Sequence, residues 1–184
     1  FFVVSRFGQR GQRCRPCVCL PYALVYCSLL VRATSLKDCC TIAAHVTLTE
    51  MQIYLAADHN GFEMKNELVA WLSGQGHSVT DMGPDEYEKT DDYPDYGIKV
   101  DEAVAEDQDN RFGILLCGSG VGMAVVADKV RGVRAGLVHD PDIAQVARRD
   151  DDINVLALGA SYISLEQAKD VVGAWLQEDF SGAE

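Results

Sequence analysis

The sequence predicts an α/β fold in which helices cover both faces of a parallel sheet. From Met51 onward, short apolar runs alternate with longer segments whose apolar residues recur at helical spacing. The apolar runs lack the polar alternation of a strand with one wet face, so both faces of the sheet are expected to be buried. Five runs alternate with five helical segments. This pattern indicates a three-layer αβα sandwich around a five-stranded parallel sheet, Rossmann-like in layout.

The elements follow in chain order from these two patterns. The expected strands are residues 52–57, 77–80, 112–116, 133–138 and 153–158. The expected helices are the segments 62–72, 94–106, 123–127, 142–149 and 164–176. Gly74 and Gly76 end the first helix, and Ser164 is the expected N-cap of the last. In such sheets ligands bind beyond the carboxyl ends of the strands, where this chain has polar residues and glycines.

The composition changes sharply near Met51. The formal net charge is -12, but residues 1–50 carry about +4 and residues 51–184 about -16, and six of the seven cysteines lie in the first 50 residues. We expect 51–184 to be the functional domain and 1–50 to be an N-terminal extension outside it, translated from upstream sequence. The alternative is a signal or anchor segment, because a short apolar run follows several arginines.

The domain's charge and cysteine content narrow the function classes. A strongly acidic body argues against nucleic acid as a partner, since nucleic-acid binding needs a basic surface. One cysteine in this part of the chain provides no disulfide framework, which is typical of a reducing compartment. We therefore expect a cytoplasmic protein with no membrane partner. The cysteines near the N-terminus lack a second pair at ligand spacing, so no metal site is expected.

The stretch from Phe112 to Asp128 is the strongest candidate for a site. A buried strand ends at Cys117, the turn Gly118–Gly122 follows, and an apolar helix begins at Met123. This layout points backbone N–H groups at an anion, and it favours a thiolate at the cysteine. The spacing is neither the dinucleotide fingerprint nor a P-loop, so no cofactor is expected. A purely structural turn with a core cysteine is the alternative.

Several motifs, taken in order, resemble the ribose-5-phosphate isomerase B family, which includes the galactose-6-phosphate isomerase subunits. The resemblance covers Met51 to Glu184. It rests on Asp58-His59-x-Gly61-Phe62-x-x-Lys65, Asp92-Tyr93-Pro94, Cys117-Gly-Ser-Gly-Val-Gly122, Asp128-Lys129-x-x-Gly132-x-Arg134-Ala135, Asn154-Val155-Leu156 and Leu165-x-x-Ala168-Lys169.

The resemblance implies a cofactor-free aldose–ketose isomerase that acts as a homodimer or homotetramer with sites between subunits. Such a reaction needs a base, donors for an enediolate oxygen, a ring-opening group and a phosphate cradle. The implied base is Cys117, and Met123 occupies the position of the Glu that some members use instead. The other implied site residues are Ser119 assisting the base, the backbone N–H groups of Gly118, Gly120 and Gly122, Asp58 and His59 on the sugar and phosphate end, and Tyr93 lining the pocket.

The ring-opening residue departs from the family pattern. Asp150 stands where members carry a His, followed by Asp151 where they carry an Asn. We hypothesise that Asp150 is the catalytic ring-opening group, with a pKa raised by Asp151 and Asp152, and that Asp151 contacts substrate. An acidic loop without a catalytic role is the alternative. Arg134 is expected to fix a strand edge or a subunit contact.

Phosphate binding departs as well. Ser161 stands where the family places an Arg, and the chain stops at Glu184, about where a second basic cluster would begin. We expect a C-terminal truncation. Lys65, Arg148 and Arg149 are candidate substitutes, with solvated surface charges as the alternative. His139, at the end of a strand, either lines the pocket or is exposed.

The sequence thus predicts an isomerase that interconverts ribose 5-phosphate and ribulose 5-phosphate, or a related sugar phosphate. The rival from another class is a non-catalytic module that binds a sugar phosphate or a nucleotide on the same sheet. In that case Cys117 would be an inert core thiol.

Overall fold

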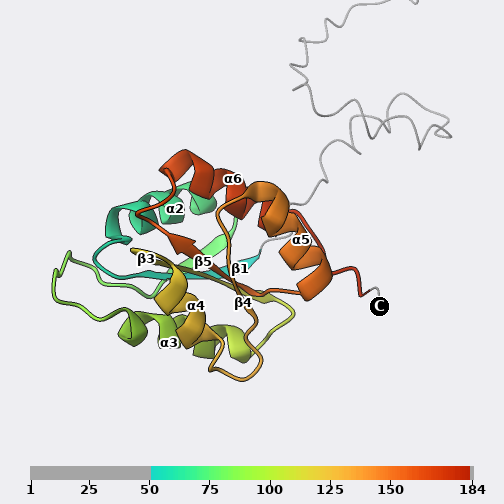
Figure 1. The fold of residues 1–184 in the computed structure, drawn as a ribbon, viewed down its shortest axis with the longest axis horizontal. Helices are drawn as coiled ribbons and strands as arrows, with labels where there is room; N and C mark the ends of the chain where they lie inside the picture. Colours follow the sequence, from blue (N-terminus) through green and yellow to red (C-terminus); the bar gives the residue numbers. More distant parts are fainter. Residues whose placement is uncertain (1–50, 183–184) are drawn as a thin grey trace, which may run out of the picture. The chain divides into compact units, whose positions relative to one another are not determined.

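The computed structural model describes residues 51–182, which form five strands and five helices in alternation (Figure 1). The expectations for residues 1–50 lie outside the described residues.

The strands form one parallel sheet, as the sequence predicts. They are β1 (Gln52–Ala57), β2 (Ser78–Asp81), β3 (Arg111–Cys117), β4 (Ala135–Leu137) and β5 (Val155–Gly159). Their order across the sheet is β2-β1-β3-β5-β4, and all neighbouring strands are parallel. Because β3 is central, the loop that follows it is flanked by the loops that follow β1 and β5.

The helices cover both faces of the sheet and confirm the three-layer sandwich. One face carries α2 (Phe62–Gly74), α5 (Pro141–Asp151) and α6 (Leu165–Leu176). The other carries α3 (Tyr93–Ala105) and α4 (Val121–Ala127), as Figure 1 shows. Ser164 caps α6 as expected: its hydroxyl accepts the N–H of Gln167, whose side chain in turn accepts the Ser164 N–H.

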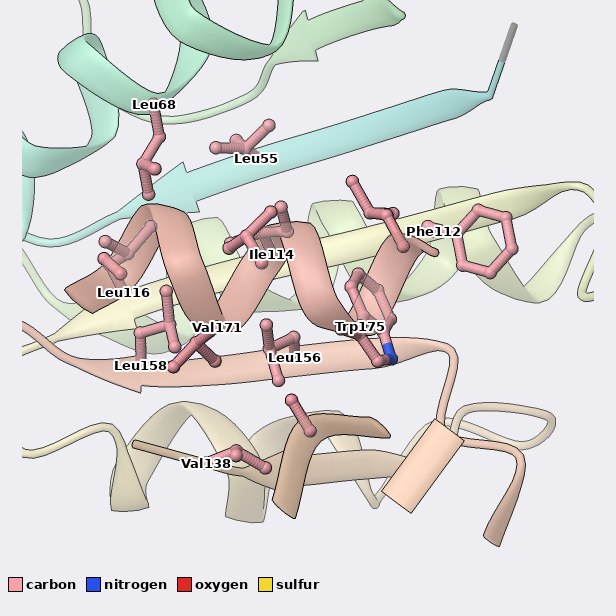
Figure 2. Packing of buried hydrophobic residues seen from close by; sticks show 14 of the residues in the cluster. Leu55, Leu68, Phe112, Ile114, Leu116, Val138, Leu156, Leu158, Val171 and Trp175 are labelled. Carbon is pink, nitrogen blue, oxygen red and sulfur yellow. The ribbon is translucent and has the colours of Figure 1, made fainter. Parts of the chain in front are cut away.

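Trp175 of α6 is the largest side chain in the core beneath α2, α5 and α6. Leu55, Ile114 and Leu156, from three adjacent strands, belong to the same buried cluster (Figure 2). The indole ring meets Phe112 edge to face at 5.6 Å between centroids. Its N–H donates to the Ile153 carbonyl at 3.3 Å, so the buried ring keeps a partner for its polar atom.

The opposite face depends on a close approach between α3 and β3. A Cβ at Gly113 would lie 2.9 Å from side-chain carbons of both Val100 and Val155. Only glycine therefore lets α3 pack this near the strand that ends at the candidate site.

Two strands begin two residues later than expected, and Asn154 is the reason. The Arg134 N–H donates to the Asn154 side-chain oxygen at 2.9 Å, and the Asn154 amide donates to the Gly132 carbonyl at 3.0 Å. Fully buried Asn154 thus bonds the backbone where the expected β4 would begin, so pairing with β5 starts only at Ala135. These two hydrogen bonds give a structural role to Asn154 of the Asn154-Val155-Leu156 motif.

Candidate active site

The loops after β1, β3 and β5 are bonded together at the carboxyl edge of the sheet. Cys117 pairs in register with Gly159, and the Asp58 N–H donates to the Leu116 carbonyl at 3.2 Å. The Ser161 N–H donates to the Gly118 carbonyl at 3.0 Å. The segments that carry the predicted site residues at this edge are therefore adjacent in space.

Cys117 ends β3 with its sulfur turned into the glycine turn. The residue is 4% exposed, and the Gly120 N–H donates to Sγ at 3.1 Å. That contact is one which a thiolate accepts more strongly than a thiol. Gly120 has a φ of 78°, and a Cβ there would lie 2.4 Å from Leu137 and 2.9 Å from the backbone of β5. The conformation that aims this N–H at sulfur thus requires glycine.

The other residues of the turn face side chains from neighbouring loops. A Cβ at Gly122 would lie 2.8 Å from the Tyr93 ring, which places that ring over the start of α4. A Cβ at Gly118 would lie 3.5 Å from the Asn60 amide. Ser119 is exposed, and its hydroxyl accepts the Val121 N–H at 3.4 Å. Tyr93 and Asn60 therefore border the turn, and Ser119 within it is exposed to solvent.

Asp58 shapes the loop after β1. Its carboxylate accepts the N–H groups of Asn60 at 2.9 Å and Gly61 at 3.2 Å, and it also accepts the Asn60 side-chain amide at 3.2 Å. Buried Asp58 thus holds His59 and Asn60 at the rim of the glycine turn. This network gives Asp58 a structural role besides the predicted contact with substrate.

A carboxylate that the sequence analysis missed lies against His59. Asp91 Oδ1 is 2.6 Å from His59 Nδ1 and accepts the His59 backbone N–H at 3.1 Å. The acidic run 85–92 gives no sign of burial in the sequence, yet the Asp91 side chain is 3% exposed. One signal was available in the sequence: Asp91 comes just before α3, and Tyr93 at the start of α3 was expected to line the pocket.

A family model described as Ribose/Galactose Isomerase matches residues 53–184. The chain belongs to the ribose/galactose isomerase family. Ribose-5-phosphate isomerase B of Escherichia coli K12 is 43% identical over 131 residues, covering 71% of this chain and 87% of the relative. D-erythrulose-4-phosphate isomerase of Pectobacterium atrosepticum is 40% identical over 132 residues, covering 72% and 86%.

A solved family structure carries a ligand. Ribose-5-phosphate isomerase B from Mycoplasma genitalium with bound ribulose-5-phosphate superposes with a TM-score of 0.71 at 36% identity, covering 72% of this chain and 87% of that one. The family resemblance and the α/β fold expected from the sequence are confirmed.

Asp150 and Asp151 lie away from the rest of the predicted isomerase site. Helix α5 runs from the carboxyl edge back to the start of β5, so its last residues lie at the opposite edge from Cys117 of the same chain. The Asp150 carboxylate accepts a hydrogen bond from Arg149 Nε at 2.9 Å. Within one chain, these two aspartates cannot meet a substrate bound at the glycine turn.

Two of the candidate phosphate substitutes, Lys65 and Arg148, are paired within the chain and are not the solvated surface charges of the alternative interpretation. Lys65 is 1% exposed, and its ammonium lies 2.5 Å from Asp81 and 3.1 Å from the Pro84 carbonyl. A buried ammonium needs such partners, and these leave it no part in anchoring an external anion. Arg148 bonds Asp152 and lies 5.1 Å over the Phe112 ring.

Asp152 is also the partner of Arg134. Arg134 donates to the Asp152 carbonyl and to its carboxylate, both at 2.6 Å, and thereby ties the chain before β4 to the end of α5. The strand-edge role expected for Arg134 is confirmed. His139 is exposed, and its Nε2 would be 2.9 Å from a Cβ on Gly159, so the ring borders the turn beside Ser119.

No helix within residues 51–182 of this family member is long and apolar enough to cross a membrane. Across the same described residues, no group of three or more His, Cys, Asp or Glu side chains has metal-binding geometry.

Proposed function

We propose that this chain is an aldose–ketose isomerase that interconverts ribose 5-phosphate and ribulose 5-phosphate, with Cys117 as the base. The observation that carries the proposal is the Gly120 N–H at 3.1 Å from a buried Cys117 sulfur at the carboxyl edge. The matched relatives include a ribose-5-phosphate isomerase B with bound ribulose-5-phosphate. Together they favour an enzyme over a binding module.

The proposed chemistry is a proton transfer through an enediolate. Cys117 takes the proton from C2 of the open-chain aldose and returns it to C1. Negative charge that develops on the enediolate oxygen is received by the N–H groups of the turn at Gly118 and Gly122. The Gly120 N–H, which donates to the Cys117 sulfur, stabilises the thiolate instead. Ser119 assists the base. Asp58, His59 and Tyr93 hold the sugar.

We propose that the working unit is a homodimer or homotetramer with sites between subunits. Asp150 and Asp151, at the far edge of the sheet, would then serve the site of a second copy. Exposed apolar side chains support a covered face beside the turn: Val121 and Val125 of α4 are 51% and 53% exposed. We place the enzyme in the cytoplasm, without nucleic-acid or membrane partners.

The choice of sugar rests on chemistry at the phosphate end. The family includes an enzyme named for a tetrose phosphate, so a four-carbon substrate is the natural second candidate. Ser161 is exposed beside Gly118 and supplies a hydroxyl where an arginine was expected. Ribose 5-phosphate remains the first substrate to assay.

Alkylation of Cys117 in the full chain separates the isomerase from a binding module. We expect iodoacetamide to modify Cys117 at neutral pH, ribose 5-phosphate to protect it, and modification to abolish ribulose 5-phosphate formation. The other six cysteines lie in residues 1–50, so peptide-resolved mass spectrometry must follow Cys117 itself. An inert Cys117 in a chain that makes no ribulose 5-phosphate would favour the binding module.

A further inference from the structure

We propose that His59, held by Asp91, is the group that opens the sugar ring; this inference rests on the proposed isomerase function. Ribose 5-phosphate is mostly a closed furanose, whereas the proton transfer needs the open aldehyde. Asp150, the group expected to open the ring, could reach this site only from a second copy, and its carboxylate already accepts a hydrogen bond from Arg149. The His59–Asp91 pair lies instead at the edge that holds Cys117.

The hydrogen bonds around His59 assign one tautomer to its ring. An ionised Asp91 carboxylate accepts hydrogen bonds and cannot donate them. The 2.6 Å contact therefore places a proton on His59 Nδ1. On the other side, Asn60 Nδ2 lies 2.9 Å from His59 Nε2 and 3.2 Å from an Asp58 oxygen. One amide hydrogen points to each acceptor, so Nε2 carries a lone pair.

Burial decides which member of the pair meets the sugar. The Asp91 side chain is 3% exposed, whereas the His59 side chain is 28% exposed. Asn60, which contacts Nε2, also borders Gly118 in the turn. Nε2 therefore lies on the substrate side. Asp91 acts only through His59, as the carboxylate of a catalytic triad orients its histidine.

Ring opening then needs no group beyond this imidazole. His59 Nε2 takes the proton from the hydroxyl on C1, and the electron pair of that O–H bond forms the C1 carbonyl. The bond from C1 to the ring oxygen O4 breaks, and O4 receives the proton from Nε2. The His59 imidazole is neutral again at the end of the step. Between the two proton transfers it is an imidazolium, which Asp91 stabilises.

The test compares a reaction that starts from the ring with one that does not. Ribulose 5-phosphate cannot close a furanose because its C5 oxygen carries the phosphate. Exchange of its C1 hydrogen with deuterated water therefore needs the base but no ring opening. The measured quantity is kcat/KM for ribose 5-phosphate divided by kcat/KM for this exchange, in the full chain.

We expect Asp91→Asn to lower this ratio by about 100-fold, since general acid–base catalysis is typically worth 10² to 10⁴. Asp95→Asn, which removes an exposed carboxylate from the first turn of α3, is the matched control and should keep the wild-type ratio. His59→Gln should lower the ratio as Asp91→Asn does, which covers the case of a poorly folded Asp91 variant. In ¹⁵N NMR, the His59 imidazole should be a single tautomer protonated at Nδ1 in the wild type and a mixture of tautomers in Asp91→Asn.

Three results would overturn the inference. An equal fall in both reactions for Asp91→Asn and His59→Gln would leave the pair only a structural or binding role. A ratio that falls in Asp150→Asn but not in Asp91→Asn would return ring opening to Asp150. A wild-type chain silent in both reactions would remove the proposed function and this inference with it, an outcome distinct from the other two.

Discussion

Cys117→Ala is expected to lower kcat/KM for ribose 5-phosphate by about 10³-fold, within the 10² to 10⁴ range of a positioned general base. The substitution removes the base, while the β3–β5 pairing and the backbone N–H groups of the turn remain. Affinity for ribulose 5-phosphate should therefore change far less than turnover. Steady-state rates and calorimetric binding on the same preparation measure the two effects separately.

Cys117→Ser is the matched control for this prediction. A serine oxygen preserves an acceptor for the Gly120 N–H but ionises far less readily than a thiol. It should bind substrate and remain nearly inactive. Wild-type turnover in either variant would show that another group removes the proton.

Asp101 gives the second large effect, on stability. The residue is fully buried in α3, and neither carboxylate oxygen has a hydrogen-bond partner among the described residues. Burial, with the nearby charge of Asp128 adding to it, raises the pKa of Asp101 to about 7. Between pH 4 and 7 the native state therefore holds a proton that the unfolded chain releases, so the Asp101 contribution to the unfolding free energy falls as pH rises.

Asp101→Asn should remove this pH dependence. At pH 8 we expect the variant to be more stable than the wild type by up to about 4 kcal/mol, the equivalent of a shift of roughly three pKa units. Below pH 4 the two should be nearly equal. Urea unfolding across this pH range measures the difference, with exposed Glu102→Gln as the neighbouring control. An Asp101→Asn variant less stable than the wild type at pH 8 would show that the ionised carboxylate has a favourable partner.

The fold was predictable because each of its elements carries its own local pattern. The buried run that ends at Cys117 and the capping residues of α6 define their elements without tertiary information. The strand boundaries near β4 were not predictable in the same way. They depend on Asn154, a side chain that bonds the backbone 20 and 22 residues earlier in the chain.

In the candidate site, too, the residues that are contiguous in sequence were predictable and those that the fold brings together were not. Cys117, Ser119 and the turn glycines are contiguous, so one motif locates them. Asp91 reaches His59 across 32 residues, and nothing in an acidic loop distinguishes the carboxylate that is buried from those that are solvated. The pairing of Lys65 was hidden for the same reason: its partner Asp81 lies on another element, and a sequence does not show which charges neutralise one another.

The most direct test of the central claim is ribose 5-phosphate turnover by the full chain in deuterated water. A proton that passes through a thiol can exchange with solvent, so we expect ribulose 5-phosphate that carries deuterium at C1, with Cys117→Ala forming almost none. Wild-type ribulose 5-phosphate that is still free of deuterium at equilibrium would contradict the account, because a proton carried by a thiol would exchange with solvent over repeated turnovers.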